Sequence, residues 1–200
     1  MIVGHLTKRN DEWYTPKYAV KALLPYLKSL QRNAYDFDEY NLPFYYKLRI
    51  LCPFDTENSS FVKVLRENGY IVDCSHIDTG KNFFSYTRKE VEDYDIIISN
   101  PPYSLKIDVF KKLFELEKPF AMLVGVVGLF DSKEKADLFS QNDFQMLYLT
   151  PRVQYYCPTF EGKIANPPYQ SAYVCKRLLK RQIEFTKLER EKLNLKDFEG

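Results

Sequence analysis

An apolar, β-branched run that ends at two consecutive prolines constrains this chain more than any other feature. The run Ile96–Ser99 is followed directly by Asn100, Pro101, Pro102 and Tyr103. A proline disfavours the helical conformation in the residue before it, so Asn100 and Pro101 are both expected to be extended. We therefore predict a buried strand that stops in a stiff corner, which displays one amide side chain, carbonyl groups and one aromatic ring.

Such a corner can bind a flat base, because it offers acceptors for an exocyclic amine and a ring that can stack on the base. An ordinary loop entrance is the alternative, since Asn and Pro are common in turns. The same four residues recur at positions 166–169, but there they follow Gly162–Ala165, which is not an apolar strand. We interpret the second copy as a loop, and its repetition as a coincidence rather than a duplicated site.

Composition fits one soluble globular domain of 200 residues with a sizeable core. The formal net charge is only +2, so any surface for nucleic acid has to be a local patch. The four cysteines are widely separated and form no pair with metal-ligand spacing, which predicts small core residues rather than a metal site. No apolar run reaches membrane-spanning length and no signal pattern opens the chain, so we expect a reduced, cytoplasmic setting without a membrane partner.

Hydrophobic spacing predicts alternating helices and strands. Helices are expected over 17–30, with an interruption at Pro25, and over 59–68, 105–116 and 132–141; strands are expected over 48–52, 70–74, 95–99, 120–124, 146–149 and 172–175. This alternation implies βαβ units and a mostly parallel sheet, in which ligands bind at the carboxyl ends of the strands. We expect one domain with an N-terminal segment and helix over 11–46, an α/β core over 47–182, and a charged surface helix or frayed tail over 183–200.

The Asn-Pro-Pro-Tyr corner resembles the catalytic motif of S-adenosylmethionine-dependent amino-methyltransferases, which methylate adenine N6 or, in a smaller branch, a protein glutamine amide. The similarity extends along the chain to phage and restriction-type adenine-N6 DNA methyltransferases. Asp11–Pro16 resembles their Thr-Pro segment, Ile50–Tyr70 resembles their cofactor unit, and Pro151–Val153 also looks similar. The resemblance covers roughly residues 11 to 180, and no separate target-recognition domain is apparent.

This resemblance implies a Rossmann-like methyltransferase fold, with helices on both faces of the sheet and a late antiparallel strand. It also implies S-adenosyl-L-methionine as cofactor, DNA as substrate, no metal, and a phage or prophage protein that acts in the host cytoplasm. The Asn100 side-chain oxygen and the Pro101 carbonyl would accept both hydrogens of the adenine amine. Pro102 would complete the corner, and Tyr103 would stack on the base.

The resemblance further assigns residues that contact the cofactor and the substrate. The expected cofactor contacts are Trp13, Tyr14, Thr15, Pro16, Pro53, Phe54, Asp55, His76, Asp78, Asn82 and Phe83. For DNA, Arg152 ranks first and Lys106 follows. Further basic residues around the mouth of the site could contact phosphates or simply form solvated faces; they are Lys111, Lys112, Lys176, Arg177, Lys180 and Arg181.

The chain departs from the family pattern on the cofactor side. The turn over 55–59 contains no glycine, whereas family members carry glycines there, and Asn58 could substitute in part by adopting a left-handed conformation. His76 stands where an acidic residue is expected, with Asp78 two places on. This leaves two alternatives open: a catalytically inactive, methyltransferase-like nucleic-acid-binding protein, or a methyltransferase that acts on RNA or protein.

Overall fold

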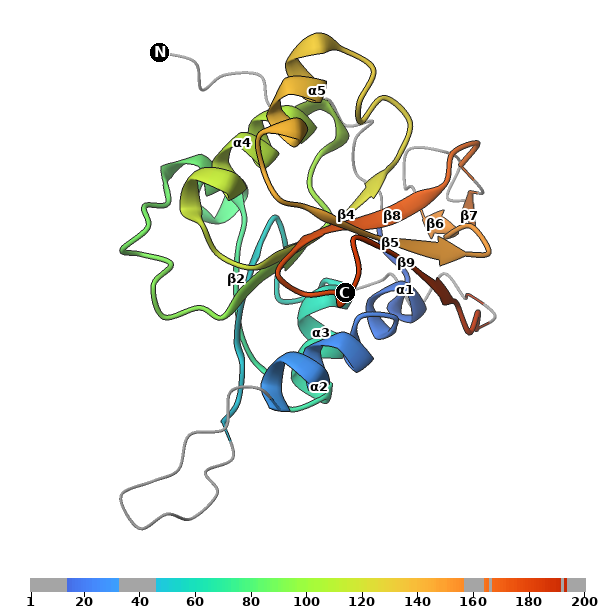
Figure 1. The fold of residues 1–200 in the computed structure, drawn as a ribbon. Helices are drawn as coiled ribbons and strands as arrows, with labels where there is room; N and C mark the ends of the chain where they lie inside the picture. Colours follow the sequence, from blue (N-terminus) through green and yellow to red (C-terminus); the bar gives the residue numbers. More distant parts are fainter. Residues whose placement is uncertain (1–13, 33–45, 157–163, 166, 192, 194–200) are drawn as a thin grey trace.

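A computed structural model describes residues 14–32, 46–156, 164–165, 167–191 and 193. The predictions for Trp13, Cys157 and Asn166 lie outside these residues. The described chain forms a seven-stranded sheet in the order β2-β1-β3-β4-β8-β5-β9 and a two-stranded sheet of β6 and β7 (Figure 1). The strands are β1 Arg49–Pro53, β2 Ile71–Ser75, β3 Ile96–Ser99, β4 Phe120–Gly125, β5 Gln145–Thr150, β6 Tyr155–Tyr156, β7 Ile164–Ala165, β8 Ser171–Lys176 and β9 Ile183–Lys187.

The large sheet is mostly parallel, as predicted. β1 runs parallel to β2 and to β3, and β3 runs parallel to β4. β8 is inserted antiparallel between β4 and β5, which is the late antiparallel strand that the sequence led us to expect. The predicted Rossmann-like α/β architecture is confirmed.

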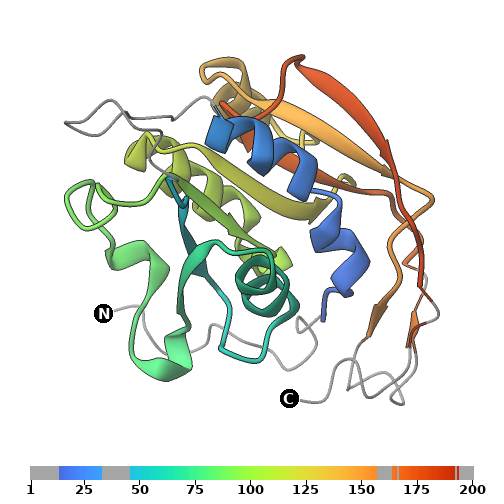
Figure 2. The same cartoon turned by 90° about the horizontal axis from the view of Figure 1, so that it is seen from below.

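Helices cover both faces of the sheet, which is also as predicted. α1 Lys17–Lys21, α2 Leu24–Arg32 and α3 Ser60–Glu67 lie on one face, and α4 Lys106–Leu116 and α5 Lys133–Ser140 lie on the other (Figures 1 and 2). Three 3₁₀ turns complete the helices: η1 Ile77–Thr79, η2 Phe83–Ser85 and η3 Tyr103–Leu105. Because side chains alternate along a strand, Ile96 and Ile98 enter the core under α3 while Ile97 enters the core under α4.

Local sequence signals explain where the helices begin and end. The first predicted helix is divided into α1 and α2, and Pro25 lies in the first turn of α2, where its missing N–H costs no helical hydrogen bond. Ser59 caps α3, with its hydroxyl accepting a hydrogen bond from the Val62 N–H at 3.4 Å. Gly69 follows α3 with a φ of +85°, a conformation that favours glycine.

The prediction for the C-terminal segment was wrong in part. Residues 183–187 are neither helix nor tail but the edge strand β9, which pairs in parallel with β5. The Glu184 carboxylate accepts the N–H groups of Lys180 and Arg181 at 2.9 and 3.0 Å, and the Phe185 ring stacks on Tyr148 at 5.4 Å. Tertiary pairing therefore overrides the charged composition, and the α/β core extends to residue 187.

The order of the strands creates a switch point beside β1. From β1 the chain crosses to β2 on one side and then returns to β3 on the other side. Crossovers that leave in opposite directions open a crevice at the carboxyl ends of the two strands, which is where open α/β sheets bind ligands. The corner that follows β3 lies at the carboxyl end of one of these two strands.

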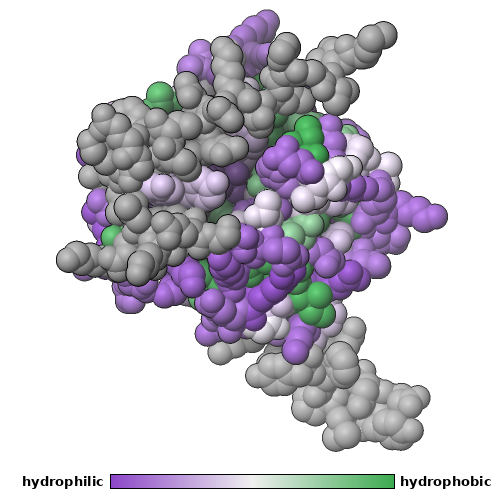
Figure 3. All heavy atoms as spheres, turned by 180° about the vertical axis from the view of Figure 1, so that it is seen from behind, coloured by the Kyte–Doolittle hydropathy of each residue, from purple (hydrophilic) through white to green (hydrophobic). Residues whose placement is uncertain are grey.

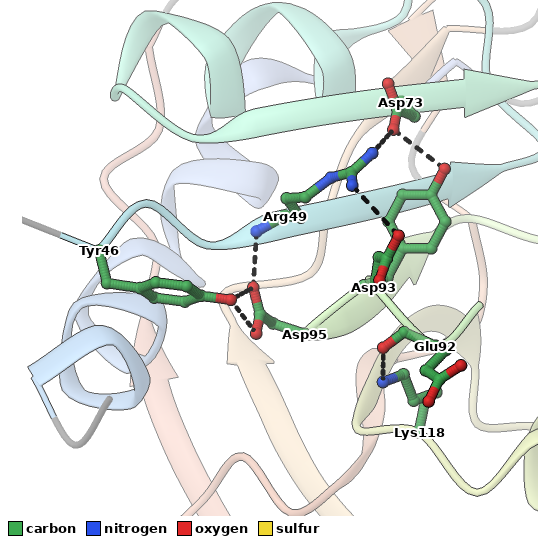
Figure 4. Close-up of polar contacts among 8 residues, drawn as sticks. Tyr46, Arg49, Asp73, Glu92, Asp93, Asp95 and Lys118 are labelled. Atoms are coloured by element: carbon green, nitrogen blue, oxygen red, sulfur yellow. Dashed lines mark hydrogen bonds and ion pairs between the residues drawn. The ribbon is translucent and has the colours of Figure 1, made fainter. Parts of the chain in front are cut away.

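A polar network fixes the opposite ends of the same strands (Figure 4). The Asp95 carboxylate accepts the Tyr46 hydroxyl at 2.7 and 2.9 Å and the Arg49 backbone N–H at 2.7 Å. The Arg49 guanidinium pairs with Asp73 at 3.2 Å and with the exposed Asp93 at 3.7 Å. These contacts join the start of β1 to the residue that precedes β3 and to the middle of β2.

None of the described helices is both long and apolar enough to cross a bilayer.

We expect Asp95→Ala to lower the free energy of unfolding by about 1–3 kcal/mol, because it leaves the Arg49 N–H and the Tyr46 hydroxyl without their acceptor. Urea denaturation at neutral pH measures this change. Asp93→Ala is the matched control, since it removes a carboxylate from the same network whose side chain is 81% exposed. An equal loss in both variants would contradict the role given to Asp95.

Candidate active site

The corner after β3 stands where the sequence placed it. Ser99 is fully buried at the end of the strand, and the chain then runs without helix or strand through Asn100, Pro101 and Pro102 until η3 begins at Tyr103. The Asn100 side-chain amide donates a hydrogen bond to the Thr15 hydroxyl at 3.2 Å. Thr15 is 7% exposed and precedes Pro16 and α1. The structure thus brings together the predicted Thr-Pro segment and the predicted catalytic amide, which are distant in sequence.

A buried carboxyl group lies at the neighbouring strand end. Asp55, two residues after β1, is 7% exposed and accepts a hydrogen bond from the Ser99 hydroxyl at 2.5 Å. Burial raises the pKa of Asp55 to about 6, although hydrogen bonds from Ser99 and Ser59 and the nearby His76 oppose the shift. Asp55 was among the predicted cofactor contacts, whereas Ser99 was not predicted. The signal for Ser99 is a lone hydroxyl at the end of an otherwise apolar strand.

The residues predicted on the β2 side form local caps. The His76 Nδ1 accepts the Asp78 N–H at 3.2 Å, while the Asp78 side chain is 81% exposed. The Asn82 oxygen accepts the Phe84 N–H at 3.0 Å and begins η2. These side chains stabilise the turns that follow β2, and their contact with a cofactor stays a prediction.

Apolar packing lies beneath these turns. Phe83 is buried, and its ring meets Phe54 edge-on at 5.0 Å. Phe54 follows Pro53, the last residue of β1, which is paired in register with Ser75 at the end of β2. The Ser75 hydroxyl is buried and makes no hydrogen bond to any part of the chain that the structure describes. A buried hydroxyl with unused hydrogen-bonding capacity beside the switch point fits a polar ligand there.

The glycine-free turn over 55–59 does not contain the left-handed residue that was expected at Asn58. Among the described residues, only Glu117 and Arg177 are non-glycines with a positive φ, so Asn58 is not left-handed and that expectation was wrong. Glu57, in the same turn, is bound by the Arg66 guanidinium and by the Cys74 thiol, the latter at 3.3 Å. The turn is therefore fixed by contacts to α3 and β2 in a conformation that any residue can adopt.

The second Asn-Pro-Pro-Tyr copy contributes to the first one. Pro167–Tyr169 is a loop, as predicted, but the Tyr169 ring meets the Tyr103 ring edge-on, with centroids 5.9 Å apart and planes at 68°. Ring carbons of Tyr169 lie 2.8 Å from the place where a Cβ on Gly125 would stand, so this close approach requires glycine at the end of β4. The tyrosines of the two copies form one aromatic wall, and sequence analysis missed this pairing.

The predicted substrate contacts are used partly within the protein. The Lys106 ammonium lies 5.7 Å from the Tyr103 ring centre and donates to the carbonyls of Gly125 and Val127 at 3.3 and 3.2 Å. Burial lowers the pKa of Lys106. Arg152 is exposed and donates to the Pro167 carbonyl at 3.3 Å, in the loop that leads to Tyr169. Contact of either residue with a substrate stays a prediction.

The more distant basic residues do not surround the site as expected. Lys111 pairs with Glu134 at 2.5 Å, and Lys112 pairs with Glu115 at 2.8 Å. Lys176 is paired in register with Phe120, the first residue of β4, so the group that it begins (Lys176, Arg177, Lys180 and Arg181) lies at the other end of the sheet. Placing this group at the mouth of the site was wrong, because β8 runs antiparallel to β4 and carries the following turn away.

Known proteins offer only a distant structural similarity to this chain. No protein family matches the sequence, and no curated protein matches it significantly. Among solved structures, the chain is similar to that of a predicted O-methyltransferase, protein Atu636 from Agrobacterium tumefaciens, with a TM-score of 0.36 and 10% identity. The match covers 70% of this chain and 77% of that chain. The fold and the candidate site are therefore assigned from the strand order and the side-chain contacts of this chain itself.

We expect Asp55→Asn to stabilise the protein increasingly as pH rises from 5 to 7.5. The carboxyl pKa is about 6 in the folded chain and near 3.8 when exposed, so the folded state holds the proton more tightly and loses stability as Asp55 ionises. The full difference is about 2–3 kcal/mol at about 1.4 kcal/mol per pKa unit. Urea denaturation across this pH range measures it.

Asp78→Asn serves as the control, because the Asp78 side chain is 81% exposed and its substitution should leave the pH dependence unchanged. Parallel pH profiles for Asp55→Asn and the unmodified protein would contradict the assignment of a buried, ionising carboxyl group.

Proposed function

We propose that this chain is an S-adenosylmethionine-dependent methyltransferase that transfers a methyl group to the N6 amine of adenine in DNA. The observation that carries the proposal is the position of Asn100: it follows β3 at the switch point, with its amide on Thr15 and its neighbour Ser99 bound to Asp55. The Asn-Pro-Pro-Tyr resemblance supports an amine acceptor at this position, and the resemblance to phage enzymes supports a phage or prophage enzyme that acts in the host cytoplasm.

The acceptor groups of the corner would help to methylate an aromatic amine, which is a difficult reaction. The lone pair of the adenine amine is delocalised into the ring, so the nitrogen is a poor nucleophile. The Asn100 side-chain oxygen and the Pro101 carbonyl would each accept one amino hydrogen, which localises the lone pair on nitrogen. The same acceptors would stabilise the positive charge that develops on that nitrogen. Fixed acceptors of this kind require little reorganisation during the reaction, and the two prolines provide that stiffness.

The aromatic wall supplies a surface for the base. Tyr103 follows Asn100 by three residues in the corner, and the Tyr169 ring packs edge-on against it from the loop before β8. Burial holds the pKa of Tyr103 well above its ordinary value, so the ring stays neutral and presents an uncharged π surface. An adenine in a duplex must first leave the base stack, at a cost of a few kcal/mol. Stacking on aromatic side chains offsets part of that cost, at about 1–3 kcal/mol per base.

The cofactor side fits a polar ligand through the chain's own groups. The Ser75 hydroxyl offers unused hydrogen-bonding capacity at the end of β2, and the Asp55 carboxyl offers negative charge at the end of β1. When bound, S-adenosylmethionine would supply an electrophilic methyl group to the amine and leave as its demethylated product, and one amine proton would pass to solvent. Thr15 would help to hold Asn100 in place through its hydroxyl.

A binding protein without turnover is the second candidate, and the turn after β1 favours it. In that turn Asn58 is not left-handed, and Glu57 is occupied by Arg66 and Cys74. The backbone of the turn therefore lacks the close approach that glycine permits. Such a protein would keep the aromatic wall and the amide but would bind a base without methylating it.

We expect Asn100→Ala to reduce methyl transfer at least about a hundredfold, because it removes one of two acceptors for the amine. Transfer of radiolabelled methyl from S-adenosylmethionine to duplex and single-stranded DNA, with identification of N6-methyladenine, measures this loss. Asn166→Ala is the matched control in the second copy and should keep activity. Equal activity in both variants would show that the site is misplaced. Preferred labelling of RNA or protein would show that the substrate is not DNA.

We expect calorimetric titration with S-adenosylmethionine, and with its demethylated product, to give a dissociation constant of about 100 μM or tighter, near −5.5 kcal/mol. Ser75→Ala should weaken that binding, since it removes the unused hydroxyl. The titration is repeated with DNA present, because substrate can complete a cofactor site. Absence of heat in both titrations, from protein shown to be folded by circular dichroism, would favour the binding protein.

A further inference from the structure

A groove at the other end of the sheet gathers basic side chains. Its volume is about 610 Å³, and it lies between the end of α5 with the turn that follows it and the turn that joins β8 to β9. Lys176, Arg177, Lys180 and Arg181 line one side, and Asn142, Asp143 and Phe144 line the other. Because Lys176 is in register with the first residue of β4, this groove lies at the amino end of that strand, whereas the aromatic wall lies at its carboxyl end.

The basic side chains of the groove are not neutralised. None of these four residues forms an ion pair with a carboxylate in the described part of the chain, whereas Lys111, Lys112 and Lys135 on the helices α4 and α5 are all paired. Arg177 donates to the Glu117 carbonyl at 3.4 Å, and the Lys176 ammonium lies 5.4 Å from the Phe114 ring centre. Of the lining residues, Asp143 alone is acidic, and the Glu184 carboxylate lies beside the lining on the N–H groups of Lys180 and Arg181, so four positive charges stand against two negative ones.

The turn that carries these charges is held in a fixed conformation. The Gln145 side-chain oxygen accepts the N–H groups of Leu178 and Leu179, each at 2.9 Å, and its amide donates to the Leu179 carbonyl at 2.6 Å. Arg177 has a φ of +56°, which is unfavourable for a residue with a Cβ and requires support from the surroundings. The cationic side chains therefore project from a turn that hydrogen bonds hold in place, so binding an anion there would require little ordering of the backbone.

The face seen from behind offers no comparable apolar surface. The described residues on that face are mostly hydrophilic, with apolar side chains in small separate patches (Figure 3). The groove presents four Lys and Arg side chains that have no carboxylate partner among the described residues, and such cations suit the phosphates of a nucleic acid.

We propose that this groove binds the sugar–phosphate backbone of a nucleic acid, at a distance from the corner that would bind the base. The identity of the nucleic acid as the substrate rests on the proposed function, whereas the binding itself does not. β4 has six residues, so the groove and the aromatic wall are about 17 Å apart at about 3.4 Å per residue. That separation equals about five nucleotide steps of 3.4 Å along one strand of B-DNA. A nucleic acid must therefore exceed about six base pairs to occupy both places.

The test is fluorescence anisotropy with the full chain and a labelled 24-base-pair duplex of mixed sequence that contains adenines, without S-adenosylmethionine, at several salt concentrations. We expect Lys180→Glu/Arg181→Glu to weaken binding at least tenfold at low salt. The slope of log affinity against log salt should become shallower by about 2, because each phosphate that a cation neutralises contributes about 0.9 to it. The milder Lys180→Gln/Arg181→Gln should show a smaller effect in the same direction. Melting curves confirm that each variant is folded.

The matched control is Lys47→Glu/Lys89→Glu, which changes the net charge by the same amount at two exposed lysines outside the groove. We expect less than a threefold effect from this control. A six-base-pair duplex can occupy the groove alone, so the groove variant should weaken its binding as well. Equal weakening by both charge reversals, or no weakening by the groove variant, would overturn the proposal; capture of an acidic protein but not DNA would do so as well.

The outcomes separate this proposal from the proposed function. A protein that binds the duplex through the groove but methylates nothing would support the groove and refute the enzyme. A protein that methylates DNA equally well with and without the groove charges, at every salt concentration, would support the enzyme and refute the groove.

Discussion

The buried hydrogen bond between Ser99 and Asp55 joins the two strand ends on which the candidate site depends. It ties the carboxyl end of β3 to the residues that leave β1, at the point where the strand order reverses. Burying a carboxyl group is unfavourable unless hydrogen bonds compensate, and burial raises the pKa of Asp55 although Ser99 and Ser59 donate to it. A site that keeps such a group beside its switch point is a candidate for function on physical grounds.

Much of the fold could be predicted because the sequence signals and the tertiary contacts agree. Ile96, Ile97 and Ile98 are apolar without interruption because β3 is buried on both faces, with alternate side chains entering the two cores. β9 could not be predicted in the same way. It is an edge strand, so Ile183 and Phe185 remain exposed and charged neighbours obscure the strand pattern. Its pairing with β5 is a long-range event that no local window contains.

The candidate site likewise contains some residues that the sequence predicts and others that depend on long-range pairing. Asn100, Thr15 and Asp55 could be found from sequence, since each follows or precedes a recognisable element in a known order. Tyr169 and Gly125 could not, because their contact depends on β8 being inserted antiparallel beside β4. That insertion places the second tetrapeptide against the first one. The repeated motif could be seen in the sequence, but the contact between its two copies follows only from the strand topology.

The distribution of charge follows from the same insertion. Beside the corner, Lys106 donates to main-chain carbonyls, and farther along α4 Lys111 and Lys112 are paired with carboxylates. The turn after β8 carries its unpaired cations to the amino end of β4 instead. A nearly neutral protein can hold a polyanion only if it concentrates free cations in this way. In protein–DNA recognition, phosphate contacts position the chain while base contacts specify the target. Here the two tasks would fall to opposite ends of one strand, with the rigidity of β4 setting the distance between them.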